Sequence, residues 1–205
     1  MNGANALAVL PPGFEDTFQD GQTVFGGILD ATARPGTVTT IGPCPTAPPP
    51  MMPAVAAVLQ CLADMDTPLL LDPALATPSV REYLRFHCNA PYADGPEGAK
   101  FAVISDAAEM PVLSIFNPGD ELYPDRSATV LVAVAGFDRG TRFELTGPGI
   151  QTRQALSVDG LPGWFPAAWA RNRKNYPTGV DVLLCSGDSI VGLPRSVTLE
   201  LSPCI

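Results

Sequence analysis

Histidine and lysine are scarce in this 205-residue sequence, which has one histidine, His87, and two lysines, Lys100 and Lys174. A single histidine excludes zinc motifs that take two histidines from one chain, such as HExxH and Cys2His2. The chain has 21 acidic and 12 basic residues and a net charge of −9. Nucleic-acid-binding proteins normally carry a basic surface, because phosphate contacts dominate their affinity. We therefore expect no nucleic-acid partner and no metal site.

Closely spaced cysteines and a secretory leader are also missing. The five cysteines are scattered, their number is odd and no CxxC pair occurs, which argues against a disulfide framework or an iron–sulfur cluster. The first residues, MNGANALAVLPPGF, contain no basic residue and only a short apolar run, unlike a signal peptide. These features favour a cytoplasmic protein with reduced thiols.

An uninterrupted hydrophobic run long enough to cross a membrane is absent. Residues 35–63 carry no charge and have the length of a membrane-spanning helix. However, they contain seven prolines, and each proline inside a helix would break it or kink it. We predict no transmembrane segment and no membrane partner.

The apolar content of 46% is sufficient for a folded core, and we expect a single domain over residues 1–205. Helical spacing of apolar residues predicts four helices, at 14–33, 53–62, 78–87 and 162–173. The first should bury one stripe, formed by Phe14, Phe18, Phe25, Ile28, Leu29 and Thr32. Its Gly26-Gly27 pair costs about 1 kcal/mol per glycine relative to alanine, so we expect a kink or a closely packed neighbour there.

Short β-branched or apolar runs predict strands at 37–41, 69–71, 101–105, 129–135, 142–146, 181–185, 190–193 and 197–201. The run 129–135 is apolar throughout, as expected for a central strand that is covered on both faces. The alternating run 142–146 is predicted to pair with it. Helices and strands in this order indicate one three-layer α/β/α domain with a mixed central sheet.

Two short motifs resemble the sequence motifs of catalytic or nucleotide-binding sites. The segment Gly187-Asp188-Ser189-Ile190 resembles the nucleophile block of one lipase class, but the only histidine precedes it, so a hairpin turn is favoured. Gly147-Pro148-Gly149 lacks the third glycine of a dinucleotide fingerprint and is interpreted as a turn. No phosphate-binding P-loop motif occurs.

The candidate ligand-binding residues are Arg85, His87 and Arg195, which lie at predicted helix and strand ends, where α/β sheets place ligands. His87 could protonate a leaving group or could simply form hydrogen bonds within the fold. A second basic cluster is formed by Arg171, Arg173 and Lys174. It is either a clamp for a triphosphate or an acidic partner surface, or a set of cations that stabilise a helix end. No residue is assigned a catalytic role.

Three aromatic residues, Trp164, Phe165 and Trp169, lie within six positions of one another. They either fill the core or form an interface, where tryptophan is enriched. A charged content of only 16% favours a surface that is partly covered by a partner. Because twofold dimers are the commonest closed assembly, we expect the isolated chain to be a homodimer that uses these aromatic residues.

Six segments in register resemble the H-subunit family of the bacterial carbon–phosphorus lyase system of phosphonate catabolism. The segments are 25–36 (FGGILDATARPG), 62–71 (LADMDTPLLL), 84–91 (LRFHCNAP), 145–150 (LTGPGI), 176–185 (YPTGVDVLLC) and 187–200 (GDSIVGLPRSVTLE). The resemblance spans nearly the whole chain. The family commonly has a basic residue at the position of Gly26 and often also at Gly27, so any partner or phosphate contact of that residue must be made differently here.

The resemblance implies a cytoplasmic subunit of an assembly with G-, I-, J- and L-type subunits. With those subunits it would exchange the adenine of MgATP for a phosphonate, which gives a ribose 1-phosphonate 5-triphosphate. A radical iron–sulfur subunit would then cleave the carbon–phosphorus bond. The implied fold is similar to that of pyridoxal-phosphate transferases without the cofactor, and homodimers of the isolated subunit are implied.

Three functions are therefore compared. The first is an accessory subunit with no activity alone and no bound cofactor, with MgATP a substrate of the complex only. It fits a chain that has few catalytic groups. The second is a nucleotide- or phosphonate-binding module. The third, a pyridoxal-phosphate enzyme, needs a desolvated lysine, and neither Lys100 nor Lys174 has the sequence environment for one.

Overall fold

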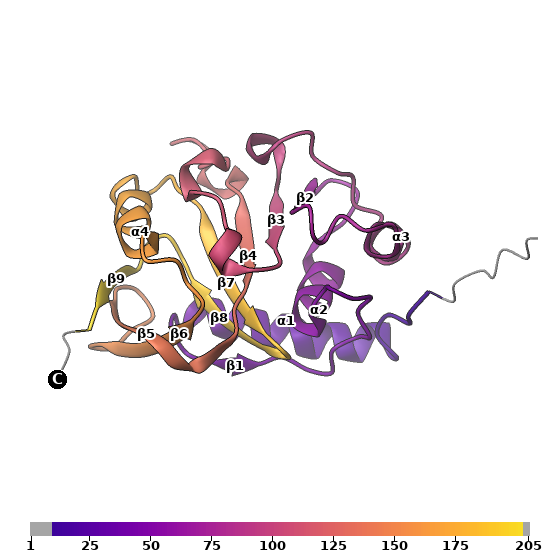
Figure 1. The fold of residues 1–205 in the computed structure, drawn as a ribbon, viewed down its shortest axis with the longest axis horizontal. Coiled ribbons are helices and arrows are strands. Elements are labelled where there is room, and N and C mark those ends of the chain that lie inside the picture. Colours follow the sequence, from indigo (N-terminus) through magenta and orange to yellow (C-terminus); the bar gives the residue numbers. More distant parts are fainter. Residues whose placement is uncertain (1–9, 203–205) are drawn as a thin grey trace, which may run out of the picture.

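A mixed sheet of six strands forms the centre of the computed structural model, which describes residues 10–202. The strand order is β1-β8-β7-β4-β3-β2 (Figure 1). Neighbours among β2, β3, β4 and β7 are parallel, whereas β8 and β1 continue the sheet in antiparallel pairings. These strands are β1 Thr39–Thr40, β2 Leu69–Leu71, β3 Phe101–Ile104, β4 Thr129–Ala133, β7 Asp181–Ser186 and β8 Ser189–Leu193.

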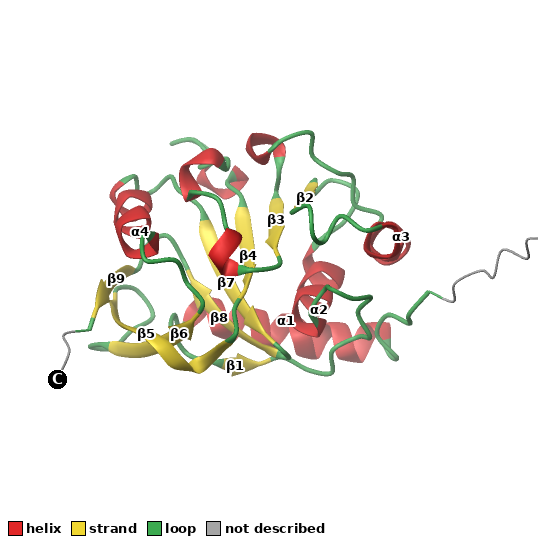
Figure 2. Ribbon diagram, viewed as in Figure 1, coloured by secondary structure: helices red, strands yellow, loops and turns green. Residues whose placement is uncertain are grey.

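Both faces of this sheet are covered, and each covering layer has its own apolar core. On one face the core is formed with helices α1 (Thr17–Ala33), α2 (Pro53–Leu62) and α3 (Pro78–His87). On the other it is formed with α4 (Phe165–Lys174), several short 3-10 turns and a second sheet. Figure 2 shows this separation of the helices to the two sides of the sheet. The protein is therefore α/β with a mixed sheet, as predicted. The layer on the second face contains a small sheet beside α4, which the predicted α/β/α layering did not include.

The central position of the run 129–135 is confirmed. Strand β4 lies between β3 and β7, and its residues from Val130 to Ala133 are all buried. Alternate side chains enter the two cores, with Leu131 on the α1 side and Val132 on the α4 side. A strand that is covered in this way has no face on which polar residues could reach water, which explains its continuous apolar sequence.

The predicted pairing of 142–146 with this central strand is wrong. Strand β5 (Gly136–Thr146) instead pairs with β6 (Gln154–Asp159) and β9 (Thr198–Leu201) in a separate three-stranded antiparallel sheet. Phe143 and Leu145 are buried in the second core, and the residues between and beside them are at least partly exposed. Such alternation suits a sheet that buries one face only, not the middle of a sheet that is covered on both.

The helix boundaries follow local signals closely. Helices α2 and α3 have the predicted bounds, and each begins with a proline at its first position. Helix α1 begins at Thr17 because the Asp16 carboxylate accepts hydrogen bonds from the backbone N–H groups of Phe18 and Gln19, which makes Asp16 the N-cap. Phe14 therefore lies before the helix. Helix α4 begins three residues later than predicted, at Phe165.

Both suspected turns are confirmed. Gly187 and Asp188 join β7 to β8 as a tight hairpin, and the positive φ of 59° at Gly187 is a conformation that glycine adopts without strain. The Gly147-Pro148-Gly149 segment follows β5 as a turn. Within residues 10–202, no helix is long and apolar enough to span a membrane.

The buried face of α1 differs from the prediction. Val24, Ile28 and Ala31 are buried, whereas Phe18, Phe25 and Leu29 of the expected stripe are exposed. The reason is a close approach between the helix and the sheet. A Cβ atom at Gly27 would lie 2.7 Å from Cγ2 of Ile41, and one at Gly192 on β8 would lie 2.4 Å from the carbonyl oxygen of Ala31. The helix thus packs through its small residues, and its large aromatic residues face outward.

Substitution of the two adjacent glycines of α1 by alanine should have opposite effects on stability. Gly26 has open space around it, so Gly26→Ala should stabilise the protein by about 1 kcal/mol through helix propensity. Gly27→Ala places a methyl group against the buried, β-branched Ile41, and overpacking of about 1–3 kcal/mol should exceed the same propensity gain. Urea unfolding of both variants measures the difference, and equal shifts in the same direction would contradict the close packing.

Candidate functional site

The three predicted ligand-binding residues are not brought together. Arg85 and His87 lie in the last turn of α3, whereas Arg195 lies in the connection between β8 and β9. Each of the three lines a different cavity. One site formed by all three is therefore not present in the structure.

Arg195 is held by the protein itself. Its guanidinium forms an ion pair with Asp181, with Nη2–Oδ2 and Nε–Oδ1 distances of 2.5 and 3.2 Å. Nη1 donates to the carbonyl oxygens of Pro124 and Pro177 at 2.8 and 3.4 Å, and Nη2 also donates to the Ser127 hydroxyl. These are five bonds for the five N–H donors of an arginine. Arg195 ties three loops to the start of β7 and retains no donor for a ligand.

His87 has a structural hydrogen bond of its own. Its Nε2 lies 3.1 Å from the carbonyl oxygen of Pro11. A carbonyl can only accept, so Nε2 carries the proton. Nearby, the Phe14 backbone N–H donates to Gln60 Oε1 at 3.4 Å. Together these bonds fasten the segment before α1 to α2 and α3. A residue larger than glycine would not fit at position 13, because its Cβ atom would lie 2.7 Å from Nδ1 of His87.

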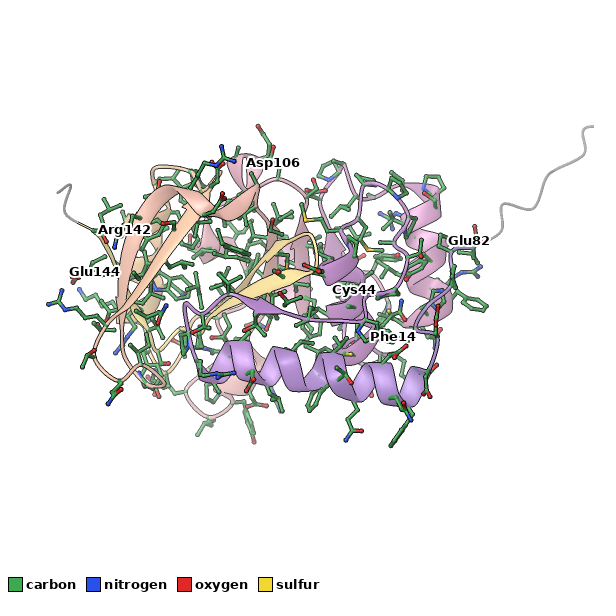
Figure 3. All side chains as sticks on the ribbon, turned by 90° about the horizontal axis from the view of Figure 1, so that it is seen from below. Phe14, Cys44, Glu82, Asp106, Arg142 and Glu144 are labelled. Carbon is green, nitrogen blue, oxygen red and sulfur yellow. The ribbon has the colours of Figure 1, made fainter. Side chains whose placement is uncertain are left out.

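Beside this segment lies a cleft of about 630 Å³ between the start of α1, the end of α2 and the end of α3. We call it the aromatic cleft, because phenylalanines from α1, α3 and the segment before α1 line it. Its main lining residues are Phe14, Phe18, Phe25, Gln60, Cys61, Phe86 and His87. Figure 3 shows Phe14 beside one end of α1. Thr17 and Gln22 of α1 also line the cleft, so polar side chains lie beside the phenylalanine rings.

The rim of the aromatic cleft exposes unusually large apolar side chains. Phe18 is 78% exposed and Phe86 is 70% exposed, and Phe25 is also classed among the exposed residues. Single exposed apolar residues are common, but several that border one cleft indicate an interaction surface. Sequence analysis found the aromatic stripe of α1 through its helical spacing but assigned it to the core. Only the close approach at Gly27 reveals that it faces outward.

Cys61, the thiol in the cleft, is not set up as a nucleophile. Burial raises the pKa of Cys61 to about 11, although a backbone hydrogen bond from Phe25 opposes the shift. Its Sγ donates to the carbonyl oxygen of Gly21 at 3.5 Å. Burial likewise raises the pKa of Cys44 to about 11 and that of Cys88 and Cys185 to about 12. These thiols stay protonated at neutral pH and react slowly. Cys204 lies outside the described residues.

The aromatic group that was expected to form an interface is largely internal. Phe165 and Trp169 have no exposed surface, and their ring centroids lie 6.0 Å apart. The indole N–H of Trp169 donates to the carbonyl oxygen of Val197 at 2.9 Å. These two residues cannot contact a second chain, because they already fill the core under α4. Trp164 alone of the three is partly exposed.

The basic cluster at the end of α4 is divided between two environments. The Arg173 guanidinium lies over the Tyr176 ring, 5.3 Å from its centroid. Arg171 and Lys174 instead line a cavity of about 470 Å³ beside α4. Over residues 10–202, no group of three or more histidine, cysteine, aspartate or glutamate side chains is arranged to hold a metal ion.

The structural role of Arg195 can be tested by exchange for lysine. Arg195→Lys keeps the charge but loses the planar set of five donors, so Ser127, Asp181 and two carbonyls compete for fewer bonds. We expect a loss of about 2 kcal/mol in the free energy of unfolding. Arg85→Lys, at an exposed position, is the matched control and should stay within about 0.5 kcal/mol of the parent. Equal urea midpoints for the two variants would contradict this role.

Comparisons with known proteins agree with the resemblance found in the sequence. The family model described as bacterial phosphonate metabolism protein (PhnH) matches residues 12–200. The alpha-D-ribose 1-methylphosphonate 5-triphosphate synthase subunit PhnH of Rhizobium meliloti (strain 1021) is 35% identical over 187 residues, which cover 91% of this chain and 94% of that protein. The putative C-P lyase subunit protein HtxG of Stutzerimonas stutzeri is 42% identical over 79 residues, or 38% of this chain and 40% of that protein. This chain therefore belongs to the PhnH family of bacterial phosphonate metabolism proteins.

Proposed function

We propose that this chain is an accessory subunit of a cytoplasmic carbon–phosphorus lyase system. In that system it takes part, with G-, I-, J- and L-type subunits, in making a ribose 1-phosphonate 5-triphosphate from MgATP and a phosphonate. The observation that carries the proposal is the nearly end-to-end similarity to the Rhizobium meliloti synthase subunit, 35% identical over 91% of this chain.

An accessory role, rather than activity of this chain alone, is supported by the placement of its reactive groups. Displacement of adenine needs an acid for the leaving base and concentrated positive charge or Mg²⁺ for the triphosphate. The Nε2–H group of His87 donates a hydrogen bond to the carbonyl oxygen of Pro11. The N–H donors of Arg195 are all used in hydrogen bonds within the fold. The cavity that His87 lines has no arginine or lysine among its lining residues. An acid placed beside concentrated positive charge would therefore have to be completed by the other subunits.

We also propose that the fold is related to that of pyridoxal-phosphate transferases, with the cofactor absent. The two-sided mixed sheet supports the relationship. The environments of the two lysines support the proposal that the cofactor is absent. Lys100 Nζ donates to the Asp125 carbonyl at the surface, and Lys174 is exposed on α4. A Schiff-base lysine is enclosed away from water, whereas neither of these two lysines is buried.

The aromatic cleft is the surface that we assign to self-association of the isolated chain. The originally expected interface is reduced to Trp164, whereas Phe18, Phe25 and Phe86 are exposed and adjoin one cleft. A second copy would bury these rings, and aromatic residues are enriched at the centres of interfaces. The interface that we propose for the homodimer is therefore formed by α1 and α3 instead of α4.

Activity measurements test the accessory role. The purified chain should release no adenine from MgATP in the presence of methylphosphonate, and it should co-purify with the other phosphonate-operon subunits. The assembled complex should release adenine. Adenine release by the chain alone, lost in His87→Ala, would overturn the accessory role, and so would failure to join the complex.

Light scattering tests the interface. Phe86→Asp places a charge in the aromatic cleft and should convert a dimer to a species of 21.5 kDa, the mass of one chain. Leu122→Asp is the matched control, because Leu122 is 83% exposed in the loop before β4 and the dimer should persist. Both substitutions are at exposed positions and should change the free energy of unfolding by less than about 0.5 kcal/mol. A dimer that survives Phe86→Asp would refute this interface.

A further inference from the structure

The cavity beside α4 is the only one of the cavities described above that is bordered by two cationic side chains. It has a volume of about 470 Å³ and lies between the last turns of α4 and the short helical turn Leu113–Ile115. Arg171 and Lys174 line it from α4, and no acidic residue is among its lining residues. In a chain with a net charge of −9, a positively lined cavity is a local exception to the overall field.

Both cations are free to act on a ligand. The ion pairs among residues 10–202 use Arg34, Arg139, Arg153 and Arg195, and neither Arg171 nor Lys174 takes part in any of them. The simple alternative is that the two side chains cap the end of the helix. However, the carbonyl oxygens of Asn172 and Arg173 already accept backbone N–H groups, from Asn175 and Tyr176. Two carbonyl oxygens of the last turn are thus satisfied without Arg171 or Lys174.

The remaining lining supplies further donors and an apolar wall. The hydroxyl of Ser114 and the amide of Asn175 are polar groups of the cavity. Val112, Leu113 and Ala168 form its apolar part. An arginine fork, an ammonium group, a hydroxyl and an amide are donors that suit a tetrahedral oxyanion. The volume is within the range of small-molecule sites and exceeds the need of a bare oxyanion.

The helix that bears the cations is firmly fixed. The buried Asn172 side chain forms two hydrogen bonds with the backbone of Val180, Nδ2 to the carbonyl at 2.8 Å and N–H to Oδ1 at 2.9 Å. On the same helix, the indole of Trp169 is bonded to Val197. Because the backbone under Arg171 and Lys174 is preorganised, a ligand has to order only the two side chains.

We propose that this cavity binds a small molecule that carries a phosphate or phosphonate dianion and a compact apolar substituent. The dianion contacts Arg171, Lys174, Ser114 and Asn175, and the substituent lies against Val112 and Leu113. Inorganic phosphate, an organic phosphonate and the terminal group of a triphosphate share this chemistry. The inference rests on the cavity alone and stands whether or not the chain is an accessory subunit.

Nuclear magnetic resonance titration of the ¹⁵N-labelled full chain tests the proposal. Methylphosphonate, inorganic phosphate and tripolyphosphate are added separately, at a pH at which the phosphonate is a dianion. The backbone amide signals of Ser114, Asn172 and Asn175, and the side-chain amide signals of the two asparagines, should shift saturably. Half-saturation is expected at about 1 mM or below. The probe that binds most tightly identifies the source of the oxyanion. Methanesulfonate, which has a similar shape but a single charge, should bind about tenfold more weakly.

Charge-matched variants show whether the cavity is responsible. Arg171→Gln and Lys174→Gln should each weaken binding about tenfold. Arg142→Gln removes the same charge from an exposed position on β5 and should leave binding unchanged. Figure 3 shows Arg142 on the outer side of the second sheet. All three positions are partly or fully on the surface, so the thermal midpoints should agree.

Three results would overturn the proposal. The first is no saturable shift at about 10 mM of any of the three probes. The second is equal weakening by Arg142→Gln, which would indicate a general charge effect. The third is a shift with hexaglutamate but not with methylphosphonate, which would make the cavity part of a surface for an acidic protein.

Discussion

The close contact between α1 and the sheet determines much of the rest of the structure. Gly27 on the helix and Gly192 on β8 remove the two side chains that would hold these elements apart. The helix therefore comes near enough to bury Val24, Ile28 and Ala31. Its rotation about its own axis is fixed by the same contact, which turns Phe18 and Phe25 toward solvent and creates one wall of the aromatic cleft. Packing of small residues at one face thus produces an exposed aromatic face at the other.

Sequence patterns predicted where the helices and strands lie better than they predicted which of them contact one another. The bounds of α2, β2 and α3 were predicted because proline at the first helical position and short apolar runs act locally. The aromatic stripe of α1 was also found, but helical periodicity does not reveal whether a stripe of large or of small residues faces the sheet. Strand β5 was found without its partners, since the choice between β4 and the β6–β9 pair depends on contacts between distant segments.

The candidate site shows the same limit. Arg85, His87 and Arg195 were selected for their chemistry, yet two of them are engaged by atoms that no local pattern identifies. The carbonyl oxygen of Pro11 is 76 residues from His87, and the Ser127 hydroxyl is 68 residues from Arg195. The basic cluster of α4 was visible in the sequence, but the residues that face it, Val112 to Ser114, come from a loop with no distinctive composition. The sequence identified side chains with the right chemistry for a binding site. Only the fold shows which of these side chains already have hydrogen-bond partners within the protein.

The hydrogen bond between His87 and Pro11 also closes a long loop within the chain. The two residues are 76 positions apart, and α1, α2 and α3 all lie between them. Closing a loop of that length costs conformational entropy, so the bond forms only where the three helices already hold its two ends close together. A shift of α1 relative to α3 would separate the two partners, and the bond therefore depends on the packing of all three helices at once.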